Sequence, residues 1–169
     1  MTLEQLNALP TPQLAEALRQ CCGAEAWVQG MLAKFPVPDA DTLMDDAKTV
    51  WFALPEDDWR EAFRHHPKIG QDVESLRRKF ASTAQWAAGE QSGVQAASEE
   101  TLQALAAGNT EYEQKFGYIF IVFATGKTAE EMLALLQARL LNKSEDEIRE
   151  AATEQDKITR LRLEKLLAP

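Results

Sequence analysis

The sequence is poor in several residue types that mark particular protein classes. Only two cysteines occur among its 169 residues, and they are neighbours, Cys21 and Cys22. Adjacent cysteines are unsuited to an ordinary intrachain disulfide, so we expect two packed thiols in a reducing compartment, with the cytoplasm as the default location. No apolar run approaches the roughly 20 residues of a membrane-spanning helix, and no basic-then-apolar signal pattern opens the chain.

Positive charge is also scarce. The chain has 18 Lys and Arg residues against 27 Asp and Glu residues, which gives a net charge of −9 at pH 7. This balance argues against nucleic acid or an anionic membrane as a partner. No cysteine and histidine array of the kind that binds zinc is present, so no metal is expected.

The remaining composition, 45% hydrophobic and 27% charged, is typical of a soluble globular protein. A chain of 169 residues can form one domain with a sizeable core, so we expect a single domain over residues 1–169. Four aromatic side chains are expected to anchor that core: Trp27, Trp51, Trp59 and Trp86.

Helix-start signals recur along the chain and predict an all-α fold, a multi-helix bundle. The predicted starts are at Thr2, Thr11, Asp41, Ser98, Thr128 and Ser144. Three of these precede Gln5, Glu131 and Glu147 by three residues, which is the spacing of a capping box. Gly117 is placed to end the helix that begins after Ser98.

One segment departs from the helical pattern. Residues 118–124 are all apolar, and their β-branched and aromatic side chains favour a strand. No second strand is available, and a lone strand would leave backbone groups unpaired. We therefore expect a central apolar segment around residues 118–125, buried and either extended or helical. In extended form it would offer N–H groups to a ligand; a plain core segment is the alternative.

The only two histidines, His65 and His66, stand directly before Pro67. An amphipathic helix leads into them, and Pro67 disfavours helical backbone at His66, so the helix is expected to end there. The helix dipole favours the protonated imidazole at such a position by about 0.3–1 kcal/mol, and histidine titrates near neutrality. The pattern therefore suits a proton donor; a solvated histidine pair at a helix end is the alternative.

Two further polar groups could bind a ligand. Glu90 and Gln91, bordered by glycines and apolar residues, could hydrogen-bond adjacent N–H and C=O groups of a planar molecule, or could be a solvated pair. Arg160 and Arg162 point roughly 200° apart around a helix, so at most one can easily face an internal cleft. There its guanidinium would suit a carboxylate or a urea-type carbonyl, whereas two surface arginines are the alternative.

Taken in order, these features resemble the 2-oxo-4-hydroxy-4-carboxy-5-ureidoimidazoline (OHCU) decarboxylase family. The matching motifs are His66-Pro67 with Ile69-Gly70, Gly89-Glu90-Gln91, Tyr112 with 116–121, and Lys157-Ile158 ahead of Arg162-Leu163. The resemblance implies an all-helical fold, usually a homodimer, acting in uric acid degradation on a small ureidoimidazoline substrate. It also implies a cofactor-free reaction that releases CO2 and forms (S)-allantoin.

The resemblance also assigns roles to residues. The family's catalytic histidine falls on His66 and its catalytic glutamate on Glu90. The substrate-binding positions fall on Pro67, Ala87, Gln91, Ile121, Val122, Phe123, Ala124, Thr125 and Arg162. Many members carry a serine where Ala87 stands, so that hydroxyl contact is missing or is supplied by Ser82, Ser92 or water.

Two other functions fit parts of the sequence. A non-catalytic helical adaptor would expose both histidines and would leave Glu90 far from His66. A metal-dependent hydrolase would use His65, His66 and Glu90, although adjacent histidines point in different directions. The decarboxylase instead requires that His66 and Glu90 converge on one small, largely dry pocket, where His66 protonates an enol-like intermediate.

Overall fold

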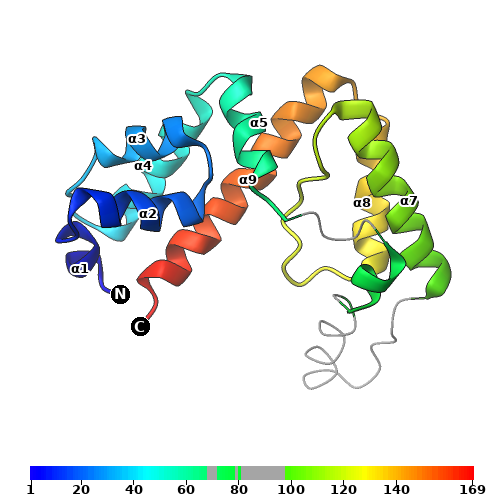
Figure 1. Ribbon diagram of the computed structural model, residues 1–169, viewed down its shortest axis with the longest axis horizontal. Helices are drawn as coiled ribbons and strands as arrows, with labels where there is room; N and C mark the ends of the chain where they lie inside the picture. Colours follow the sequence, from blue (N-terminus) through cyan, green and yellow to red (C-terminus); the bar gives the residue numbers. More distant parts are fainter. Residues whose placement is uncertain (68–71, 79, 81–97) are drawn as a thin grey trace. The chain divides into compact units, whose positions relative to one another are not determined.

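The computed structural model describes residues 1–67, 72–78, 80 and 98–169, and no strand occurs among them (Figure 1). The prediction of an all-α fold is confirmed. The helices are α1 (Leu3–Asn7), α2 (Thr11–Cys21), α3 (Glu25–Leu32), α4 (Ala40–Phe52), α5 (Glu56–Arg64), α7 (Glu99–Phe116), α8 (Ala129–Leu140) and α9 (Ser144–Leu167). Residues 73–78 are also helical. Within the described ranges, no helix is long and apolar enough to cross a membrane.

The chain forms two compact units, each with its own buried apolar side chains. The first comprises Met1–His66 and Ile148–Pro169, and the second comprises Pro67–Glu147. The boundary falls inside α9, whose first turn belongs to the second unit and whose remainder belongs to the first. The expectation of one domain over residues 1–169 stays a prediction.

Tryptophans anchor the core of the first unit. Trp27, Trp51 and Trp59 are all buried, as predicted, and each donates its indole N–H to a backbone carbonyl at 2.9–3.0 Å. The acceptor for Trp51 is Ala152 in α9, 101 residues further along the chain. A buried donor without an acceptor costs about 1–3 kcal/mol, so this bond fixes α4 against α9. Trp86 lies outside the described residues.

Three of the six predicted helix starts follow the predicted chemistry. The capping boxes at Thr2 and Thr128 are present, and the Ser98 hydroxyl caps α7. Thr11 is itself the first residue of α2 instead of preceding it. Gly117 ends α7 at φ 83°, a left-handed conformation that glycine adopts without the steric cost of a Cβ.

Two predicted caps are wrong. α4 is capped by Asp39, whose carboxylate accepts a hydrogen bond from the Thr42 N–H at 2.7 Å, while Asp41 lies inside the first turn. Ser144 and Glu147 were expected to form a capping box at the start of α9. Glu147 is instead completely buried, and its carboxylate is occupied by side chains outside α9. A buried carboxylate must have such donors, and this requirement overrides the local capping pattern.

Arg139 supplies the largest part of that environment. Its Nε and Nη2 lie 2.7 and 2.6 Å from Oε1 of Glu147, which also accepts the Tyr112 hydroxyl at 2.5 Å. Oε2 of Glu147 accepts from Asn142 at 2.9 Å. The remaining guanidinium donor, Nη1, reaches the carbonyl of Ile121 at 2.5 Å. One buried ion pair in the second unit therefore also holds the backbone of the apolar segment.

The apolar segment follows α7, and α7 packs beside α8 (Figure 1). Residues 119–124 are neither helical nor part of a strand, so the helical alternative is wrong. The hydrogen bonds found here involve carbonyls: Ile121 accepts from Arg139, and Phe123 and Ala124 accept from Lys127. Among the described residues, no partner is found for the N–H groups of residues 119–125. That these N–H groups bind a ligand stays a prediction.

Candidate active site

His66 follows the C-terminus of α5. The helix ends at Arg64, with His65 as its C-cap, so it ends slightly before the predicted residue. The N–H groups of His65 and His66 bond to carbonyls three residues back, those of Ala62 and Phe63. This tighter turn closes the helix ahead of Pro67, which disfavours helical backbone at His66.

The His66 ring is partly buried and contacts α9. Its Nε2 lies 2.5 Å from the side-chain oxygen of Gln155. Gln155 is completely buried, and its amide nitrogen donates to the Thr159 hydroxyl at 3.1 Å. Buried polar side chains of this kind are held in place by their hydrogen bonds, so the imidazole has a defined orientation.

The neighbouring histidine has different surroundings. His65 is exposed, and its ring lies against Gly23, where a Cβ would approach the His65 Cγ to 2.5 Å. The two imidazoles therefore face different partners, as predicted for adjacent histidines. Among the described residues, no group of three or more His, Cys, Asp or Glu side chains could hold a metal ion.

Arg162 is the arginine that lies near His66. Gln155, Thr159 and Arg162 follow the spacing i, i+4, i+7 and share one face of α9. The Arg162 guanidinium donates to the carbonyl of Cys21 at 3.2 Å, and its charge acts on the His66 ring. Arg160 is exposed and paired with Glu164. Of the two alternatives, the structure thus favours Arg162.

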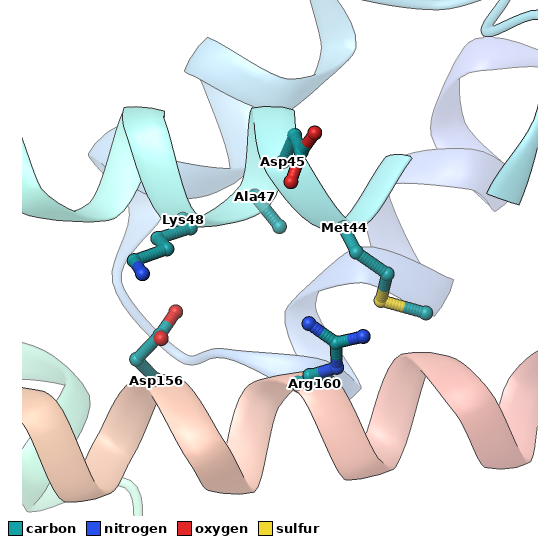
Figure 2. A pocket seen from close by; sticks show the side chains of 6 residues that line it. All are labelled: Met44, Asp45, Ala47, Lys48, Asp156 and Arg160. Atoms are coloured by element: carbon teal, nitrogen blue, oxygen red, sulfur yellow. The ribbon is translucent and has the colours of Figure 1, made fainter. Parts of the chain in front are cut away.

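A separate pocket lies between α9 and α4 (Figure 2). It measures about 120 Å³, and it is lined by Met44, Asp45, Ala47, Lys48, Asp156 and Arg160. Burial raises the pKa of Asp156, and the charges of Lys48 and Arg160 oppose that rise. Neither His66 nor Gln155 lines this pocket, so it is distinct from the histidine site.

Burial lowers the pKa of His66 below its ordinary value of 6.5. The hydrogen bond to Gln155 opposes this effect, whereas the positive charges of Arg162 and His65 add to it. The sequence-based expectation that the helix end favours protonated His66 is therefore wrong. Loss of hydration and nearby positive charge outweigh a dipole effect of about 1 kcal/mol or less. His66 is mainly neutral at neutral pH.

The two cysteines are buried free thiols, as expected. Burial raises the pKa of Cys21 to about 11 and that of Cys22 to about 12. The thiolate is the reactive form, so neither side chain is a nucleophile at neutral pH. Their contribution to the site is structural.

The described structure contains only some of the predicted site residues. Glu90, Gln91 and Ala87 lie outside the described residues. Pro67 is exposed, and residues 121–125 belong to the second unit. The proposed convergence of His66 and Glu90 thus stays a prediction.

Gln155 and Thr159 were missed by the sequence analysis. Their spacing relative to Arg162 could have indicated a shared helix face. The sequence pattern contains no sign that this face meets His66.

The chain matches known proteins along most of its length. A family profile described as OHCU decarboxylase matches residues 7–164. The chain is 38% identical over 151 residues to the uric acid degradation bifunctional protein TTL of Arabidopsis thaliana, covering 88% of this chain and 45% of that protein. It is 22% identical over 167 residues to the uric acid degradation bifunctional protein of Bacillus sp. (strain TB-90), covering 98% of this chain and 32% of that protein. The chain spans less than half the length of these two curated relatives.

Two solved structures are similar. The crystal structure of an OHCU decarboxylase in the presence of (S)-allantoin superposes with a TM-score of 0.70 at 34% identity, covering 89% of this chain and 96% of that one. The crystal structure of an (S)-allantoin synthase gives a TM-score of 0.73 at 19% identity, covering 98% of this chain and 54% of that one, a likeness of fold alone. By its profile match and its sequence identity to these relatives, the chain belongs to the OHCU decarboxylase family.

Proposed function

We propose that this chain decarboxylates OHCU to (S)-allantoin without a cofactor. The observation that carries the proposal is the partly buried His66 imidazole, held by Gln155 at the position that the family resemblance assigns to catalysis. Membership of the family and the (S)-allantoin present in a similar solved structure support this substrate class.

The substrate's own structure removes the need for a cofactor. Its carboxylate sits on a carbon next to a ring C=N bond. When CO2 leaves, the electron pair of the broken C–C bond forms a new C=C bond, and the C=N pair moves to the ring nitrogen, which takes up one proton from solvent water. The resulting enol becomes the ketone when its hydroxyl loses a proton and the former imine carbon gains one. Delivery to one face of that carbon produces a single enantiomer.

His66 moves the proton in the second step. The pKa of His66 is lowered, mainly by burial, so the ring begins neutral and can accept the hydroxyl proton. It then donates this proton to the adjacent carbon, as the donor role predicted from the sequence requires. Glu90 holds the hydroxyl or ureido groups of the substrate and helps to transfer the hydroxyl proton.

The other assigned residues bind and orient the ring. Gln91 and Arg162 bind polar groups of the substrate, and the backbone of residues 121–125 offers N–H groups. Pro67 and Ala87 contribute contacts to its surface. Restricting the substrate to one reactive orientation is itself a large part of catalysis.

The direct test starts from urate. The unstable intermediate is generated fresh, the protein is added, and chiral allantoin is followed by circular dichroism. We expect faster formation of the S enantiomer than in the spontaneous reaction, with activity retained in a chelator. Absence of acceleration would instead favour the helical adaptor.

The resemblance also leads us to propose a homodimer, and the cysteine content a cytoplasmic location. Sedimentation equilibrium of the purified chain tests the first proposal. A mass equal to that of one chain at micromolar concentration would contradict it. Fractionation of the native cells tests the second.

A further inference from the structure

The contacts behind His66 form a chain of hydrogen bonds that ends at a sulfur atom. The Thr159 hydroxyl bonds to the thiol of Cys22, and this bond lowers the Cys22 pKa. Thr159 acts as the acceptor in its bond with Gln155, because the Gln155 amide nitrogen donates to its hydroxyl oxygen.

This direction determines how the Gln155 amide is turned. Its NH2 group donates to Thr159 at 3.1 Å, and its oxygen therefore faces His66. An amide oxygen only accepts, so the His66 nitrogen 2.5 Å away must carry a proton. That nitrogen is Nε2. In the neutral ring the other nitrogen, Nδ1, is then unprotonated.

Nδ1 is the other ring nitrogen of His66. Within the described part of the chain it has no hydrogen-bond partner. Gln155 and Thr159 are buried, so the two side chains cannot readily rearrange. Protonation at Nδ1 also leaves the bond from Nε2 to Gln155 intact.

We propose that Gln155, held by Thr159, is a positioning residue that keeps the proton of neutral His66 on Nε2 and makes Nδ1 the nitrogen that accepts and delivers the substrate proton. This proposal rests on the proposed function. The hydroxyl proton of the enol passes to Nδ1, and the same proton passes from Nδ1 to the ring carbon. His66 returns to its starting form, so this conversion of enol to ketone needs no other reactant.

The first test measures directly which ring nitrogen of His66 carries the proton. The chain has only two histidines, so ¹⁵N spectra of the whole protein show two imidazoles, which a His65→Asn variant assigns. We expect neutral His66 to carry its proton on Nε2. Gln155→Met removes the acceptor and should give a mixture of tautomers with a lower titration midpoint. Gln155→Glu keeps an acceptor there, and should retain the tautomer while raising the midpoint.

The second test is kinetic. General acid–base catalysis contributes about 10²–10⁴-fold, so misorienting His66 in Gln155→Met should lower kcat at least about tenfold. Since Gln155 does not hold the substrate, KM should change less than about twofold. Gln155→Glu should recover part of kcat. The control is Asp156→Asn, one residue along α9 and facing the separate pocket, which should leave kcat unchanged (Figure 2).

The outcomes separate the two proposals. A wild-type protein that does not accelerate allantoin formation contradicts the proposed function, yet its His66 tautomer still tests the role of Gln155. A proton on Nδ1 in the wild type overturns this inference, even if the enzyme is active. So does a folded Gln155→Met variant with unchanged tautomer and kcat. If Gln155→Met does not fold, the inference is tested by the His66 tautomer in the wild type and by the His66 titration midpoint in Gln155→Glu.

Discussion

Arg139 and Glu147 form an ion pair in the interior of the second unit, with Nη2 and Oε1 2.6 Å apart and side chains only 6% and 0% exposed. The glutamate is additionally bonded by Tyr112 and Asn142, and the arginine by the carbonyl of Ile121. The pair thus ties α7, α8 and the first turn of α9 to the apolar segment.

Arg139→Met should be strongly destabilising. It removes one partner of a buried pair and leaves the Glu147 carboxylate without its main donor, which typically costs about 3–5 kcal/mol. The free energy of unfolding in urea measures the effect. The control is Arg160→Met, which breaks the exposed pair with Glu164 and should cost at most about 1 kcal/mol. Equal losses in the two variants would contradict the structural role of the buried pair.

The two histidines should differ sharply in their effect on catalysis. His66→Asn removes the group that moves the proton, so kcat should fall by about 10²–10⁴-fold with the fold retained. His65→Asn should change kcat only slightly, because the exposed His65 ring contacts Gly23 instead of Gln155. Steady-state kinetics on fresh substrate, with circular dichroism as a check of folding, measure both. Similar losses would refute the assignment of His66.

Glu90→Ala should lower kcat/KM by more than the loss of acid–base help alone, because the proposed role includes an orienting contact. We therefore expect a loss above about 10²-fold, with both kcat and KM affected. Glu90→Gln keeps the hydrogen-bonding shape without the charge and should recover part of KM. Activity close to that of the wild type in Glu90→Ala would remove this residue from the mechanism.

Acid should destabilise the chain partly through His66. The folded pKa of His66 lies below its ordinary 6.5, mainly because of burial, with Arg162 and His65 adding to the effect and Gln155 opposing it. The unfolded chain therefore takes up the proton more readily. The contribution of neutral His66 to the free energy of unfolding is complete above about pH 6.5. It is lost as the pH falls through the lower pKa of His66 in the folded protein.

Urea unfolding at about pH 7.5 and about pH 5 checks this dependence. The free energy of unfolding should fall more in the wild type than in His66→Gln, which has no titrating ring. His65→Gln should keep most of the wild-type fall, because the charge of His65 is the smallest of the effects on the pKa of His66. An equal fall in the wild type and His66→Gln would show that His66 does not contribute.

Gly23→Ala should reveal the contact with His65. The new Cβ would lie 2.5 Å from the His65 Cγ, too close for either backbone to remain in place. Overpacking of this kind costs about 1–3 kcal/mol. Adding His65→Ala removes the obstruction, so the double variant should recover most of the loss, with a coupling of at least about 0.5 kcal/mol. Additive losses would contradict the contact.

Local sequence patterns predicted the helices well. Capping at Thr2, Ser98 and Thr128 and the glycine stop at Gly117 depend on hydrogen bonds and sterics within one turn, so short motifs suffice. The same reasoning failed at Glu147. Its spacing from Ser144 matches a capping box, but Arg139, which is not part of that motif, determines where its carboxylate lies.

The sequence by itself determined the all-α fold, the end of α5 near Pro67 and the singling out of His66. These follow from backbone restrictions and side-chain periodicity, which act over a few residues. Only the tertiary structure decided that Gln155 lies behind the ring, that Arg162 and not Arg160 is near it, and that the imidazole is mainly neutral. These properties depend on burial and on contacts between residues nearly ninety positions apart, so a local sequence pattern cannot predict them.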